Sequence, residues 1–149
     1  MSALGQNLTA AHAEVKAEIA RTDAKTALLL AFVGAVLAGT WTVARDLPMN
    51  ALAYTVGGLG IALLVAAAGL LLRSVRPNLR GRHGFPLWAT LTPEEITTTV
   101  NGGDLAADVA ELSRLAVAKF TCLRRAVDLT CAGGSLLILA VLIAVGGAA

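Results

Sequence analysis

The chain has 149 residues, of which 56% are hydrophobic and only 15% charged, and its mean hydropathy is +0.73. These values lie outside the range of ordinary soluble domains and predict that lipid is the solvent for much of the chain. The formal net charge of +2 is too close to balance to indicate a nucleic acid partner. We therefore expect an all-α integral membrane protein whose partners include the lipid bilayer.

Residues 1–25 are polar and carry a narrow apolar stripe. Its members recur at three- or four-residue intervals, as on one face of a helix, and are Leu8, Ala11, Val15, Ile19 and Thr22. Several charged side chains in this region argue against a secretory signal peptide. The pattern predicts an amphipathic cytoplasmic helix that runs directly into the membrane.

Two hydrophobic spans follow. Residues 26–44 contain no charge, and as a helix they rise about 28 Å, which suits a hydrocarbon core of about 30 Å. Residues 45–48 include Pro48 and are too few for a domain, so they predict an external turn. Residues 49–72 then return as the second transmembrane helix, long enough to cross with some tilt.

Small residues recur at four-residue spacing in both spans, at Ala35 and Gly39 in the first and at Gly58, Ala62 and Ala66 in the second. Such residues let two helix backbones approach closely, and they predict a tight hairpin. The alternative is that spans rich in alanine and glycine contain such spacings by chance. That alternative stays open.

Residues 73–126 return to water and form a cytoplasmic segment with two helices. The segment opens with basic residues, Arg73, Arg76, Arg80 and Arg82. Further on, Thr92 followed by Pro93 and Glu95 has the pattern of an N-cap, a first-turn proline and a capping box, so it predicts a short helix. A second helix, with apolar residues on one face from Leu105 onward, continues without a breaker toward the membrane.

The third predicted transmembrane helix covers residues 127–149. It is uncharged apart from Asp128. An acid near a membrane boundary can mark an ion pathway, but Arg124 and Arg125 lie three to four residues before it and can pair with it. We expect the paired interfacial charge and keep the ion pathway as the alternative.

The basic residues also predict the orientation. Three of them precede the first span, only Arg45 lies in the turn, and eight lie between Arg73 and Arg125. Cytoplasmic loops carry the excess of lysine and arginine. We expect a multi-pass protein of the inner (cytoplasmic) membrane, with a cytoplasmic N-terminus and an external C-terminus.

Nothing in the sequence indicates catalysis. The chain has no nucleophile motif, phosphate-binding loop or dinucleotide fingerprint, and its Cys122, Cys131, His12 and His83 lack the spacing of a metal site. We expect a protein that is not an enzyme and holds no metal or cofactor. The arginines from Arg73 to Arg82 suit anionic headgroups, or alternatively an anion site for a phosphate-bearing ligand.

Four motifs, in order, resemble the Pycsar transmembrane effectors (PycTM) of bacterial anti-phage defence. They are an R-x-D-x-K entry to the first span at Arg21–Lys25, V-R-P-x-L at Val75–Leu79, T-x-E-E at Thr92–Glu95, and L-A-x-x-K-F-x-x-L-R-x-A at Leu115–Ala126. The resemblance implies a functional link to a nucleotide cyclase, with cyclic UMP or cyclic CMP as activating ligand. It also implies an effector that impairs the inner membrane. An ordinary β-roll nucleotide-binding domain does not fit between the second and third spans.

We expect a homo-oligomer, because three slim helices cannot enclose an aqueous path whereas several copies can. The residues expected to sense the ligand, or to couple the cytoplasmic helices to the spans by a charge network, are Arg21, Asp23, Lys25, Arg76, Lys119 and Arg124. Two other classes remain open. One is a holin-like or conjugation-associated membrane protein that needs no nucleotide, and the other is a non-toxic membrane-anchoring subunit.

Overall fold

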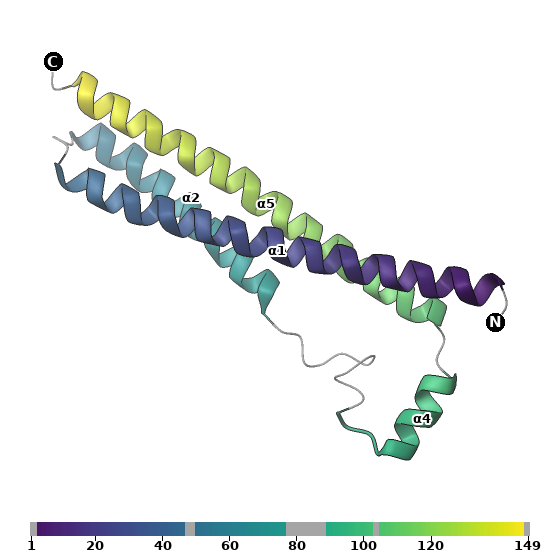
Figure 1. The fold of residues 1–149 in the computed structure, drawn as a ribbon. Helices are drawn as coiled ribbons and strands as arrows, with labels where there is room; N and C mark the ends of the chain where they lie inside the picture. The colour runs from purple at the N-terminus through teal and green to yellow at the C-terminus, as the bar shows by residue number, and fades with distance from the viewer. Residues whose placement is uncertain (1–2, 47–49, 77–88, 103–104, 148–149) are drawn as a thin grey trace. The chain divides into compact units, whose positions relative to one another are not determined.

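The computed structural model describes residues 3–46, 50–76, 89–102 and 105–147. Within these ranges the chain forms helices and no strand, so the all-α prediction is confirmed. The helices labelled in Figure 1 are α1 (Ala3–Asp46), α2 (Ala51–Val75), α4 (Pro93–Gly102) and α5 (Leu105–Gly146).

Helices α1 and α5 are unusually long. They contain 44 and 42 residues, which corresponds to lengths of about 66 and 63 Å at 1.5 Å per residue. That is roughly twice the hydrocarbon thickness of a bilayer, about 30 Å. Each of these helices therefore has a polar part and an apolar part in one unbroken rod. Together with α2 they are, within the described ranges, the three helices long and apolar enough to cross a membrane, as the sequence predicts.

The chain divides into two compact units. The first comprises Met1–Arg21 and Arg76–Ala118, and the second comprises Thr22–Val75 and Lys119–Ala149. In the first unit, helix α4 begins with reciprocal capping bonds. The backbone N–H of Thr92 donates to Oε2 of Glu95 at 2.8 Å, and that of Glu95 donates to Oγ1 of Thr92 at 3.3 Å. The predicted capping box is confirmed.

In the second unit, parts of α1, α2 and α5 lie side by side, with α2 antiparallel to the other two (Figure 1). The buried residues of α2 follow one another at alternating intervals of four and three, and are Ala53, Gly57, Gly60, Leu64, Ala67 and Leu71. This 3.5-residue repeat is typical of left-handed helix packing. The buried residues of α5 begin with the same alternating intervals of four and three. They are Ala126, Thr130, Gly133, Ala140 and Ala144.

The second unit buries small residues and exposes large ones. Most of its buried positions are alanine, glycine or threonine, whereas Leu28, Ile138 and Leu142 are 73%, 65% and 63% exposed. In water this arrangement would lose the stabilisation that comes from burying large apolar side chains. In lipid the tails are as apolar as leucine, so helices associate through close packing of small residues instead. The burial pattern therefore fits a membrane solvent.

Helices α2 and α5 approach each other closely at Gly60 and Gly133. A Cβ atom built on Gly60 would lie 2.9 Å from the carbonyl oxygen of Gly133, and one built on Gly133 would lie 2.9 Å from that of Gly60. The series predicted to pack the first two spans together, Ala35, Gly39, Gly58, Ala62 and Ala66, is exposed throughout. That prediction is wrong, because α5 packs against α2 on the face that carries Gly60.

Candidate functional site

Asp23 of α1 and Lys119 of α5 form an ion pair across 96 residues of sequence. The Lys119 ammonium lies 2.5 Å from Oδ1 and 2.8 Å from Oδ2 of Asp23, so both carboxylate oxygens accept hydrogen bonds. The Lys119 side chain is 19% exposed and that of Asp23 is 45% exposed. The pair is thus partly shielded from solvent and ties α1 to α5 at the polar end of the second unit.

Two buried threonines of α1, Thr22 and Thr26, lie on either side of Asp23 in sequence. The Thr26 hydroxyl donates to the Thr22 carbonyl oxygen at 2.8 Å. A threonine hydroxyl that bonds back to its own helix can enter an apolar interface without leaving a donor unpaired. These small side chains pack α1 closely against its neighbours at the level where Asp23 meets Lys119.

Cys122 links α5 to α2. Its thiol donates to the carbonyl oxygen of Leu70 at 3.4 Å, and it lies one helical turn after Lys119. Together Asp23, Lys119, Cys122 and Leu70 form what we call the three-helix clasp, in which polar contacts join all three helices of the second unit. Three residues beyond Leu70, Arg73 ends the apolar run of α2.

The structure brings together two of the six residues predicted to sense ligand or couple charge, namely Asp23 and Lys119. Arg21 instead pairs with Glu18 on its own helix, with 3.0 Å between Nη1 and Oε2. The remaining three are exposed and have no ion pair with any described residue, and they are Lys25, Arg76 and Arg124.

Two further sequence expectations concern charge. Of the four arginines expected to suit anionic headgroups or, alternatively, an anion site, Arg80 and Arg82 lie outside the described residues, while Arg73 and Arg76 are exposed. Asp128 is also exposed, and in the part of the chain that the structure describes it has no ion pair with Arg124 or Arg125. The paired interfacial charge expected from the sequence is therefore not formed within one chain.

Sequence reasoning missed the contribution of Cys122, which it considered as a possible metal ligand. The available signal was its three-residue separation from Lys119, which places the two side chains on the same part of the α5 surface. Its partner is a backbone carbonyl oxygen of another helix, and no pattern of side chains in a sequence marks such a partner. Both cysteines are free thiols.

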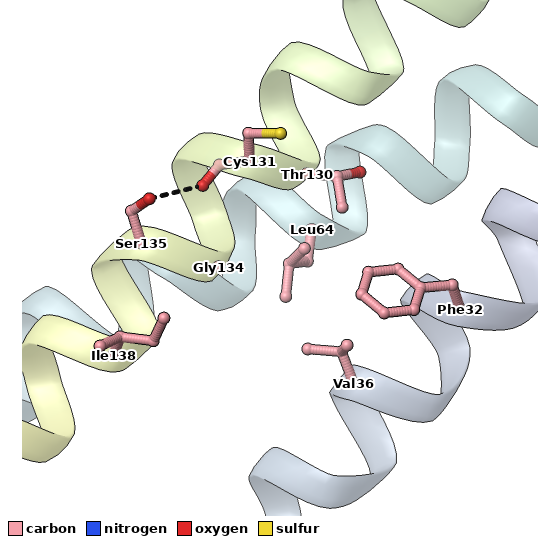
Figure 2. A pocket seen from close by; sticks show the side chains of 8 residues that line it. All are labelled: Phe32, Val36, Leu64, Thr130, Cys131, Gly134, Ser135 and Ile138. Carbon is pink, nitrogen blue, oxygen red and sulfur yellow. Dashed lines mark hydrogen bonds between the residues drawn. The ribbon is translucent and has the colours of Figure 1, made fainter.

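A groove of about 340 Å³ opens between α1 and α5, with Leu64 of α2 between them (Figure 2). Its lining residues are Phe32, Val36, Leu64, Thr130, Cys131, Gly134, Ser135 and Ile138. The hydroxyls of Thr130 and Ser135 donate to carbonyl oxygens of α5, at 2.8 and 2.9 Å. Cys131 is the only titratable residue in this lining, so the groove suits an apolar group better than an ionic ligand.

Among the described residues, no group of three or more histidine, cysteine, aspartate or glutamate side chains gathers as a metal site would require. The polar features of the second unit are thus an interhelical ion pair, a thiol contact and exposed basic residues.

Comparison with known proteins gives one result of substance. Residues 7–146 match the family model PycTM, described as the Pycsar effector protein domain. Neither the curated proteins nor the solved structures give a match. The family match covers nearly the whole of a chain with three helices that can cross a membrane. The chain therefore belongs to the PycTM family of Pycsar effectors, as a multi-pass membrane protein of antiviral defence.

Proposed function

We propose that this protein impairs the inner membrane of the infected cell when a cyclic pyrimidine nucleotide, cyclic UMP or cyclic CMP, is produced by a partner cyclase. It does so without catalysing a reaction. The observation that carries the proposal is the match of residues 7–146 to the Pycsar effector domain. The three apolar helices and the three-helix clasp supply a physical route from signal to membrane.

The route runs along α1 and α5. Each helix continues without a break from a polar part into an apolar span. A rigid helix transmits displacement of one end to the other, so a change at the polar ends moves the spans. The clasp lies at the start of the apolar stretches, where it holds α1, α2 and α5 in one arrangement.

The phosphate of a cyclic nucleotide is an anion that competes with the Asp23 carboxylate for the Lys119 ammonium. Lys25 and Arg124 are exposed cations of the same unit. Arg21 and Arg76 belong to the first unit, and we assign them to ligand sensing on their charge alone. In this account, ligand binding releases α5 from α1 and permits the spans to rearrange.

The energies are compatible with such a switch. An ion pair with partial solvent exposure contributes about 0.2–1 kcal/mol, whereas reversing a two-state equilibrium from 1:99 to 99:1 requires about 5.5 kcal/mol of differential binding. A ligand of micromolar affinity has about 8 kcal/mol available. Loss of the ion pair therefore contributes to activation, while selective binding to the active arrangement supplies most of the free energy.

The active form is an oligomer, with the N-terminus and the segment between the second and third spans in the cytoplasm. Three slim helices cannot enclose water, so permeation requires several copies. A holin-like protein would permeabilise membranes without nucleotide, and an anchoring subunit would not permeabilise them at all.

The test is dye release from liposomes that contain the purified full-length chain. Cyclic UMP and cyclic CMP are added separately, with cyclic AMP as the purine control. Release on addition of a pyrimidine nucleotide alone supports the proposal. Equal release without any nucleotide contradicts the gated mechanism in favour of a holin-like protein, and no release under any condition favours the anchoring subunit.

A further inference from the structure

Asp128 lies on α5 at the depth of the apolar spans. Six residues before it, Cys122 contacts Leu70 of α2, and five residues after it, Gly133 contacts Gly60. Both of these α2 residues belong to the uncharged run that ends before Arg73. At 1.5 Å per residue, Asp128 is about 9 Å farther along α5 than Cys122, toward the middle of the spans.

A carboxylate at this depth needs a polar environment. Insertion of an aspartate at the centre of a transmembrane helix costs about 2.5–3.5 kcal/mol, and such residues almost always face a bundle interior or a water-filled cavity. Asp128 is exposed on the second unit and has no ion pair among the described residues. A single chain therefore leaves the carboxylate facing lipid.

Asp128 is not alone on this face. Cys131 and Ser135 follow at intervals of three and four residues, and both are exposed. At 100° per residue these three positions lie on the side of α5 opposite the buried seam formed by Ala126, Thr130 and Gly133. We call Asp128, Cys131 and Ser135 the polar stripe of α5. Cys131 and Ser135 also line the groove beside α1 (Figure 2).

We infer that copies of this chain assemble with the polar stripe turned toward a shared axis, where Asp128 lines a water-filled path that favours cations. The inference rests on the proposed function and adds the conducting surface and its selectivity. A second copy is the occupant that fits, because Arg124 lies one turn from Asp128 on an exposed part of the same helix. Opposite charges on one surface attract two copies to each other even where each carboxylate stays hydrated and is not paired. Rings of carboxylates are a known basis of cation selectivity.

Native Cys131 provides the first test. The full-length chain in liposomes is treated with a charged, membrane-impermeant methanethiosulfonate, with and without cyclic UMP or cyclic CMP, and modification is mapped by mass spectrometry. The control is a thiol introduced by Leu59→Cys, at an exposed α2 position next to Gly60. We expect Cys131 to react at least ten times faster than this control thiol when nucleotide is present. Equal slow reaction of both thiols overturns the inference.

Ion selectivity provides the second test. Reversal potentials are measured in planar bilayers across a tenfold KCl gradient for the native chain, Asp128→Asn and the control Asp46→Asn, which removes an exposed acid at the end of α1. The reversal potentials of the native chain and of the control should lie near the K⁺ equilibrium potential. The reversal potential of Asp128→Asn should shift toward zero. Unchanged selectivity in Asp128→Asn overturns the inference.

Failure of the proposed function and failure of the polar stripe as a lining give different results in these measurements. If the native chain gives no current with either nucleotide, the proposed function is contradicted and the conducting path with it. If the native chain conducts on addition of nucleotide while Asp128→Asn keeps its selectivity, or Cys131 reacts no faster than the control thiol, only the polar stripe is excluded as the lining of the path.

Discussion

The Lys119 ammonium of α5 donates to both carboxylate oxygens of Asp23 in α1, at 2.5 and 2.8 Å. This contact joins the first and last long helices of the chain at the point where their polar parts become apolar spans. Both helices continue unbroken past the ion pair. In the function that we propose, this contact couples the charged residues near the membrane to the spans.

Charge reversal tests that role. Asp23→Lys and Lys119→Asp each place two like charges opposite one another, so we expect either variant to release dye from liposomes without nucleotide. The double variant restores opposite charges in swapped positions and should regain dependence on nucleotide. Dye release is measured at equal protein-to-lipid ratio. A double variant that leaks as much as the single variants would contradict a direct coupling between these residues.

The contact between Gly60 and Gly133 predicts a difference between neighbouring glycines. Gly60→Ala places a Cβ atom 2.9 Å from the Gly133 carbonyl oxygen, and we expect the resulting overpacking to lower the free energy of unfolding by about 1–3 kcal/mol. The matched control is Gly58→Ala, because a Cβ there meets nothing within 4 Å. Alanine is the better helix former, so this control should stabilise α2 by roughly 0.5–1 kcal/mol. Unfolding in detergent micelles measures both, and equal effects would contradict the helix contact.

Asn50 caps the first turn of α2. Its side-chain oxygen accepts a hydrogen bond from the backbone N–H of Ala53 at 2.8 Å. We expect Asn50→Ala to lower the free energy of unfolding by about 0.5–2 kcal/mol, and Asn50→Asp to retain most of the stability because aspartate also caps helices. Hydrogen exchange of the first α2 turn reports the loss locally. The cap has no such role if both variants exchange as slowly as the native chain.

Arg76 is exposed at the end of α2 and pairs with no described residue. If it senses the nucleotide phosphate, Arg76→Ala should abolish growth arrest in cells that make the nucleotide, without loss of membrane insertion. The matched control is Arg45→Ala, which removes an arginine that lies 5.0 Å over the Trp41 ring near the other end of the spans. Growth and the membrane-extracted fraction are measured together. Unchanged toxicity of Arg76→Ala would remove this residue from the mechanism.

Local patterns in the sequence predicted the helices well. No proline or glycine separates the polar residues that end at Lys25 from the apolar run that begins at Thr26. The structure accordingly has one continuous helix across this boundary. The capping box of Thr92 and Glu95 was likewise predictable, because both partners lie within one turn. These features depend on neighbours in sequence, for which spacing is sufficient information.

Contacts between distant helices were harder to predict. Both Asp23 and Lys119 were selected as functional residues, but no local pattern pairs side chains that are 96 positions apart. Several glycines of α2 suit close helix contact equally well, and only the placement of α5 selects Gly60 over Gly58. Cys122 was missed because its partner is a backbone oxygen. In lipid the large apolar residues carry little information about which face is buried.

The central claim is that a cyclic pyrimidine nucleotide makes this protein impair the membrane. The most direct measurement is membrane potential and dye entry in bacterial cells that express the chain with an active or a catalytically inactive pyrimidine cyclase. The account predicts depolarisation and dye entry only with the active cyclase. Depolarisation of equal extent with both cyclases would contradict it, and so would the absence of depolarisation with either cyclase.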